Sequence, residues 1–75
     1  MHFRIKHPVT LSFRNAQGYY EAVHSMGTLE VVGDAVWLLK PLLSTDGYAR
    51  ERTITPVKTV LVLWARGDLV DDWKD

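Results

Sequence analysis

The sequence contains no cysteine and no excess of charge of either sign, because nine Lys and Arg residues are matched by nine Asp and Glu residues. The absence of cysteine excludes a disulfide-stabilised scaffold and leaves histidine and carboxylates as candidate metal ligands. The zero net charge argues against a protein that neutralises many phosphates, since such proteins are usually basic. Disordered chains combine low hydrophobicity with high net charge, so we expect this chain to fold.

The chain also lacks a long hydrophobic run. Its longest uncharged apolar stretch covers residues 60–65, far short of the ~20 residues that cross a bilayer. The opening segment, MHFRIKHPVT, contains no apolar run long enough for a signal peptide. We therefore expect a complete cytoplasmic chain that does not engage a membrane.

Residue groupings that carry catalysis or bind metals are missing as well. His2 and His7 lie near the terminus, and no histidine pair has the spacing of zinc ligands on a helix or strand. His24 precedes Ser25, but neighbours in a strand point to opposite faces and cannot act together as base and nucleophile. The five glycines are spaced like turns and form no phosphate-binding loop. The sequence thus predicts no enzyme, no metal, no cofactor and no small-molecule substrate.

The length and composition indicate one small domain. The chain has 75 residues, of which 47% are hydrophobic, enough for a single core. We expect a core at 3–66 and an acidic C-terminal tail at 67–75. A chain of this length buries about 60% of its unfolded surface, so its stability is marginal and association of copies would help.

Alternation of apolar and polar residues dominates the pattern. Val9, Leu11 and Phe13 alternate with polar residues, which is typical of a half-buried strand. Turns are expected at 15–18 and at Gly33-Asp34, and a polar loop at 44–50. Further extended segments are expected at 3–6, 29–32, 36–39, 53–55 and 57–64.

Two segments have helical signals. Residues 16–26 fit helical spacing, with Asn15 as an N-cap and Gly27 as a stop, but Gly18 inside the helix would cost ~1 kcal/mol. The adjacent tyrosines of this segment favour a strand, and a helix at 16–26 remains the alternative. At the C-terminus, Asp68 can N-cap a short helical turn over 68–75.

These elements predict an all-β fold, a small antiparallel meander or barrel of about five to six strands with a short C-terminal helical turn. Three runs carry a resemblance to a known family: VTLSFRNAQGYYEAV, TLEVVGDAVWLLKP and RTITPVKTVLVLW. Their pattern resembles the strand order of Sm-like small β-barrels over roughly residues 9–64. FRIKHP stands where those proteins have an N-terminal helix. The resemblance implies, as an alternative function, binding of single-stranded RNA.

The residues themselves favour contacts between proteins. Residues 36–43 and 57–65 are apolar on both faces, more than a small barrel can cover, and uncovered apolar surface usually has a partner. We therefore predict a non-catalytic protein-binding or assembly module, homo-oligomeric, with Val60, Val62 and Trp64 as its structural spine. Such a module could be encoded by a phage or mobile element.

Candidate contact residues are aromatic side chains beside basic ones, a pairing that also suits nucleic acid. Tyr48, Arg50 and Arg52 lie in or next to the expected loop, and Trp73 stands alone in the acidic tail. Tyr19 or Tyr20 with Arg14 forms a second pairing. The remaining large aromatics, Phe13, Trp37 and Trp64, are interpreted as core.

Overall fold

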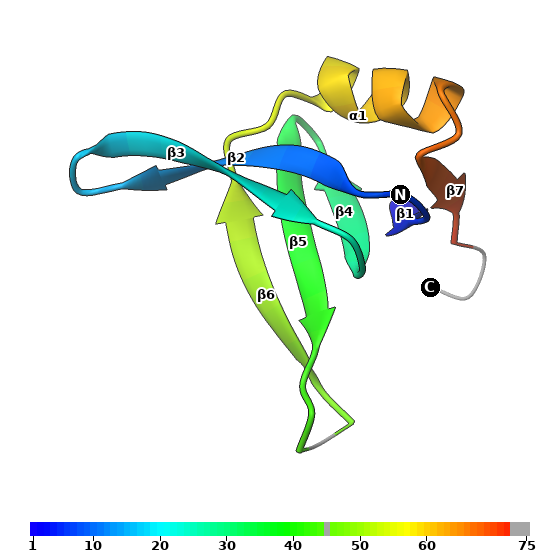
Figure 1. Cartoon of the computed structure of the whole chain (residues 1–75), viewed down its shortest axis with the longest axis horizontal. Coiled ribbons are helices and arrows are strands. Elements are labelled where there is room, and N and C mark those ends of the chain that lie inside the picture. The colour runs from blue at the N-terminus through cyan, green and yellow to red at the C-terminus, as the bar shows by residue number, and fades with distance from the viewer. Residues whose placement is uncertain (45, 73–75) are drawn as a thin grey trace.

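The computed structural model describes residues 1–44 and 46–72 of the chain. This part contains seven strands and one helix (Figure 1). In chain order they are β1 (His2–Ile5), β2 (Val9–Asn15), β3 (Gly18–His24), β4 (Thr28–Val32), β5 (Ala35–Pro41), β6 (Tyr48–Thr53), α1 (Val57–Ala65) and β7 (Leu69–Asp71).

The strands form two antiparallel sheets. The larger sheet has the order β6-β5-β4-β1-β7, and the smaller consists of β2 and β3. The hairpin of β2 and β3 crosses over the larger sheet, and α1 lies across one end of it (Figure 1). The prediction of a mostly antiparallel β fold is confirmed, as is the strand at 18–24 over the alternative helix. The sheets do not close into a barrel.

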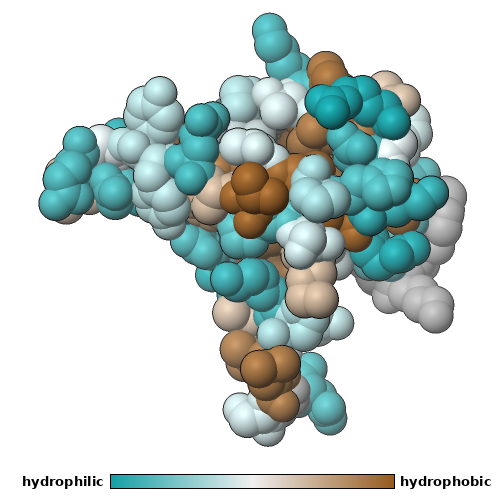
Figure 2. Space-filling view, viewed as in Figure 1, coloured by the Kyte–Doolittle hydropathy of each residue, from teal (hydrophilic) through white to brown (hydrophobic). Residues whose placement is uncertain are grey.

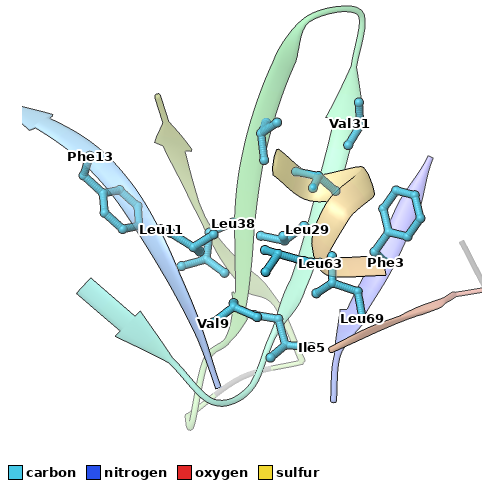
Figure 3. Close-up of a cluster of buried hydrophobic side chains, with 12 residues drawn as sticks. Phe3, Ile5, Val9, Leu11, Phe13, Leu29, Val31, Leu38, Leu63 and Leu69 are labelled. Atoms are coloured by element: carbon cyan, nitrogen blue, oxygen red, sulfur yellow. The ribbon is translucent and has the colours of Figure 1, made fainter. Parts of the chain in front are cut away.

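The core fills the space between the larger sheet and the layer formed by the β2–β3 hairpin and α1. Side chains alternate along each strand, so every second residue of β2 points inward, as the sequence predicts. Figure 3 shows these side chains converging from both layers. The core residues are Phe3, Ile5, Val9, Leu11, Phe13, Leu29, Val31, Val36, Leu38, Val60, Leu63 and Leu69.

The two sheets meet where β6 ends. The N–H of Ile54 donates to the carbonyl of Ser12 at 2.8 Å, and the N–H of Ser12 donates to Oγ1 of Thr55 at 3.0 Å. The hydroxyl of Thr53, which is fully buried, donates to the carbonyl of Val36 at 2.8 Å. The hydroxyls of Thr53 and Thr55 therefore supply hydrogen bonds at this seam, the junction of the two sheets. In a closed barrel, backbone pairing between neighbouring strands would supply them.

Replacing Thr55 with Val tests the importance of this seam. The substitution keeps the size of the side chain but removes the acceptor of the Ser12 N–H, which is then left unpaired in a partly buried position. We expect a loss of about 1–3 kcal/mol in the free energy of unfolding, measured by urea denaturation. Thr10→Val, an exposed change on the same strand as Ser12, is the matched control and should stay within about 0.5 kcal/mol.

The strand predicted at 57–64 is wrong, because this segment forms α1. The helix begins after Pro56, and Val60 and Leu63, one turn apart, enter the core. It ends in a Schellman motif, in which the N–H groups of Gly67 and Asp68 donate to Trp64 and Leu63. Gly67 adopts a φ of +87°, which a glycine reaches without strain. In the described ranges no helix is long and apolar enough to cross a membrane.

The helical register also corrects the expected spine. Val60 is fully buried, but Val62 and Trp64 are about half exposed. A strand would place all three residues on one face, whereas the 100° step of a helix turns Val62 away from Val60. Trp64 lies one turn after Val60, at the margin of the buried face, where its ring centroid is 6.3 Å from that of Phe3.

The C-terminal helical turn is a second incorrect prediction. Residues 69–71 form β7, which pairs with β1, and Leu69 is buried in the core. The segment expected as a tail thus supplies a strand. The expected loop at 44–50 is shorter than predicted, because β6 begins at Tyr48.

Candidate binding surfaces

The structure brings three of the predicted contact residues onto one surface. Tyr48, Arg50 and Arg52 alternate along β6 and therefore share the face of the larger sheet that points away from the core. The register places Arg52 directly opposite Trp37 of β5 on the same face. We call Trp37, Tyr48, Arg50 and Arg52 the aromatic–arginine face.

Contacts within this face are already extensive. The guanidinium carbon of Arg50 lies 3.8 Å from the centroid of the Trp37 ring, and that of Arg52 lies 5.8 Å from it. Nη2 of Arg50 also lies 3.0 Å from Oε1 of Glu30, whose Oε2 is 3.3 Å from Nε2 of His2. These cation–π and ionic contacts link β1, β4, β5 and β6 across the open face of the sheet, so they hold the strands together whether or not a ligand binds.

The interpretation of Trp37 as a core residue is wrong, and that of Phe13 is confirmed. Trp37 is only half-buried and lies on the outer face, whereas its neighbours Val36 and Leu38 are fully buried. Sequence reasoning missed Trp37 because the strand is apolar on both faces, and alternation cannot tell which face is inside when neither is polar.

The second predicted pairing lies on the β2–β3 hairpin. Arg14 and Tyr19 are directly opposite each other on the outer face of the hairpin. On its inner face Tyr20 stacks on Phe13, with ring centroids 5.4 Å apart. The hairpin and the aromatic–arginine face belong to different sheets, so the structure does not combine the predicted contact residues into one site. Trp73 lies outside the described residues.

The backbone of β3 has an unpaired edge. Both backbone groups of Ser12 bond to residues 54–55, away from β3. Ser12 and Glu21 are therefore a non-hydrogen-bonded pair, and the N–H and C=O of Glu21 point away from β2. By alternation, the same holds for Tyr19 and Val23. No further strand of the described chain pairs with β3 on that side.

The two sheets have four edge strands, which differ in how well they are protected from further pairing. The outer edge of β2 bonds through Ser12 to residues 54–55. β7 is short and contains Asp71, and β6 carries the consecutive charges Arg50, Glu51 and Arg52. Shortness and charge are common protections of an edge strand. β3 has seven residues, no proline and only one charged residue at neutral pH, Glu21. It is therefore the edge with the least protection.

Exposed apolar side chains gather at three places. Figure 2 shows hydrophobic surface over β3, on α1 and at the end of the β5–β6 hairpin. On β3 the exposed side chains include Tyr19 and Val23, which are 69% and 67% exposed. On α1 they are Leu61, Val62 and Trp64, and at the hairpin end Leu42 and Leu43. Lys58 is the one charged residue of the helix, and the exposed residues after it are apolar.

His24 occupies the inner face of β3, with its ring edge-on to Phe13 at 5.6 Å. Partial burial lowers the pKa of this imidazole below 6.5, nearby Lys40 lowers it further, and Glu51 acts in the opposite direction. The folded state therefore favours neutral His24, so the unfolded chain takes up the proton first as the pH falls. Stability that is present above pH 6.5 is then lost on acidification.

His24→Gln tests this effect. We expect the loss of stability between pH 7 and pH 5 to be smaller in the variant than in the unmodified chain, by less than about 1 kcal/mol because solvent screens the site. Val23→Gln, a change at the exposed neighbour on β3 that removes no titratable group, is the control and should leave the difference intact. Identical pH profiles for the unmodified chain and His24→Gln would contradict the assignment.

The described ranges hold no cluster of three His, Asp or Glu side chains that could bind a metal ion. Histidine ion pairs are present, with His7 Nδ1 3.5 Å from Oδ1 of Asp68 and His2 Nε2 3.3 Å from Oε2 of Glu30. Comparison of the chain with protein-family models, with curated proteins and with solved structures gives no match in any of the three.

Proposed function

We propose that this chain is a non-catalytic assembly module that binds protein, in the first place copies of itself, through the free edge of β3. The observation that carries the proposal is the unpaired and nearly uncharged edge of a seven-residue strand. Such an edge pairs readily with another extended strand, whose main-chain hydrogen bonds supply the affinity.

The exposed apolar side chains of β3 support the same role. Tyr19 and Val23 flank Glu21 on the outer face, so an added strand would find apolar neighbours on either side of one carboxylate. Cross-strand pairs of aromatic and β-branched side chains stabilise a sheet. The small size of the chain adds a further reason, since a domain of 75 residues gains stability by burying surface against a partner.

Placing acidic side chains along β3 tests the proposal. The double variant Tyr19→Glu with Val23→Glu sets acids on both sides of Glu21, so any antiparallel pairing of two β3 strands opposes like charges. Sedimentation of the unmodified chain at micromolar concentration should give a mass above 8.6 kDa, and the double variant should sediment as the monomer.

The matched control makes the same charge change on α1. Leu61→Glu with Val62→Glu also replaces two exposed apolar side chains, and it should leave the mass of the assembly unchanged. An unmodified chain that remains a monomer up to high micromolar concentration contradicts self-assembly. Dissociation by the α1 variant alone would move the interface from β3 to the helix.

A second candidate function is binding of single-stranded nucleic acid at the aromatic–arginine face. The observation that favours it is the convergence of Trp37 and Tyr48 with two arginines on one open sheet surface. Against it, Arg50 is paired with Glu30 and the net charge is zero. The assembly proposal expects oligonucleotide binding at background level. A salt-dependent affinity that Arg50→Glu with Arg52→Glu abolishes would favour the second candidate instead.

A further inference from the structure

We infer that the strand added to β3 is the β3 strand of a second copy, antiparallel to the first, with the two-fold axis of the dimer passing between the two Tyr20 residues. This inference rests on the proposed function and specifies its partner and register. The two hairpins would then form one continuous four-stranded sheet in the order β2-β3-β3-β2.

The geometry of β3 limits the possible registers. The inner face of each hairpin must stay on the same side of the extended sheet, so each residue pairs with one of the same orientation. A two-fold axis perpendicular to the sheet therefore passes between two copies of the same residue. Near the middle of β3 the choices are Tyr20, Glu21 and Ala22.

Electrostatic interactions disfavour the axes at Glu21 and at Ala22. An axis at Glu21 sets two glutamates directly opposite each other, which is destabilising. An axis at Ala22 sets Glu21 opposite Val23 and brings no positive charge to the carboxylate. Neither Arg14 nor Glu21 has an ion-pair partner among the described residues, so both charges are available to a second copy.

An axis at Tyr20 places favourable side-chain pairs on both faces of the extended sheet. On the outer face, Tyr19 lies opposite Glu21 of the second copy, and Arg14 follows in the same row because it pairs with Tyr19. Arg14 and that glutamate are then two strand spacings apart, about 10 Å between backbones, a gap that two long side chains can close. The symmetry repeats this arrangement, so the dimer gains two such charge pairs.

On the inner face, the same axis extends an aromatic row. Phe13 and Tyr20 already stack within one copy at an interplanar angle of 22°, and Tyr20 retains 41% exposure. Tyr20 of the second copy would lie next to it, which produces a row of four aromatic rings across four strands. Aromatic cross-strand pairs are among the stabilising ones.

The hydrogen-bonding directions agree with this register. The N–H and C=O groups of Tyr19 and Glu21 point to the open edge, and the Tyr20 axis places each Tyr19 opposite a Glu21, so these groups face one another. The two Tyr20 residues then form a non-hydrogen-bonded pair, in which opposing Cα atoms approach to about 4.5 Å.

Disulfide trapping in the cysteine-free chain tests the register. The variants Tyr20→Cys, Glu21→Cys and Ala22→Cys each place one thiol on the axis of one register, at a Cα separation that allows a disulfide. Under mild oxidation at micromolar concentration, we expect Tyr20→Cys to form a covalent dimer at least fivefold faster than the other two. Leu43→Cys, an exposed position at the end of the β5–β6 hairpin, measures random collision.

A charge exchange tests the same register without changing Tyr20. Arg14→Glu and Glu21→Arg should each raise the dimer dissociation constant about 2- to 20-fold, because two symmetric pairs become repulsive. The double variant Arg14→Glu with Glu21→Arg should restore the original constant to within about twofold. Lys58→Glu, on the helix, should have no effect.

The outcomes separate this inference from the proposed function. Fastest trapping at Glu21 or Ala22, or a double variant weaker than both single ones, overturns the Tyr20 register but leaves assembly through β3 standing. Dimerisation without trapping at any of the three positions overturns pairing of two β3 strands. A chain that sediments only as the monomer overturns both.

Discussion

Leu38→Ala is expected to remove a large part of the chain's free energy of unfolding. Leu38 is fully buried in β5, the strand between β4 and β6, and belongs to the core between the two layers. Removing a buried leucine side chain costs about 2–5 kcal/mol, because the lost transfer free energy is joined by the cost of a cavity. A domain of this length has a total stability of about 4–11 kcal/mol, so the substitution removes much of it.

Urea denaturation followed by tryptophan fluorescence measures this loss. Leu43→Ala is the matched control, because the same atoms are removed from a side chain that is fully exposed. Its free energy of unfolding should change by no more than about 0.5 kcal/mol. A small effect of Leu38→Ala would mean that the space around Leu38 collapses or that the core is packed differently from Figure 3.

Gly27→Ala is expected to destabilise the chain strongly for a different reason. Gly27 has a φ of +117°, and a Cβ built on it would lie 2.9 Å from the carbonyl oxygen of Leu39. The carbonyl belongs to a paired strand and cannot move freely, and the carbonyl of Gly27 itself accepts the N–H of Ile5. The clash therefore displaces β4 from β5 or breaks the contact with β1.

Gly18→Ala is the control that distinguishes the clash of a Cβ at position 27 from the strain of a positive φ. Gly18 has a similar φ of +129°, but no atom lies within 4 Å of the position of its Cβ. The φ alone costs about 1–3 kcal/mol in either variant. Gly27→Ala should lower the midpoint of thermal unfolding clearly more than Gly18→Ala, and equal midpoints would contradict the close approach to Leu39.

The sequence predicts the strands best where one face is polar. Val9, Leu11 and Phe13 alternate with polar residues, so both the strand and its buried face follow from the pattern. Tight turns at 15–18 and at Gly33-Asp34 are likewise local signals and agree with the hairpins of the structure.

The helix α1 could not be predicted from the alternation of polar and apolar residues. Residues 57–64 are rich in β-branched residues, whose local preference is for strands, and tertiary packing of Val60 and Leu63 overrides that preference. The sequence did contain one signal for this helix: Pro56 precedes the segment and Gly67 follows it. Proline is favoured near the start of a helix and glycine just after its end.

The candidate surfaces depend on contacts between distant segments. Tyr48, Arg50 and Arg52 share one face because β6 is a strand rather than a loop, and Trp37 joins them only through the pairing of β5 with β6. The free edge of β3 follows from the bonds of Ser12 to residues 54–55. Such pairings are set by tertiary structure, so no local pattern in the sequence reveals them.

Amide hydrogen exchange along β3 at two protein concentrations tests the central claim most directly. The amides of Tyr19 and Glu21 point to the open edge, so they should exchange fast in dilute solution and become protected as the concentration rises into the range of assembly. The amides of Tyr20 and Ala22 bond within the hairpin and should change less. Exchange at Tyr19 and Glu21 that stays fast while the chain is assembled would contradict assembly through β3.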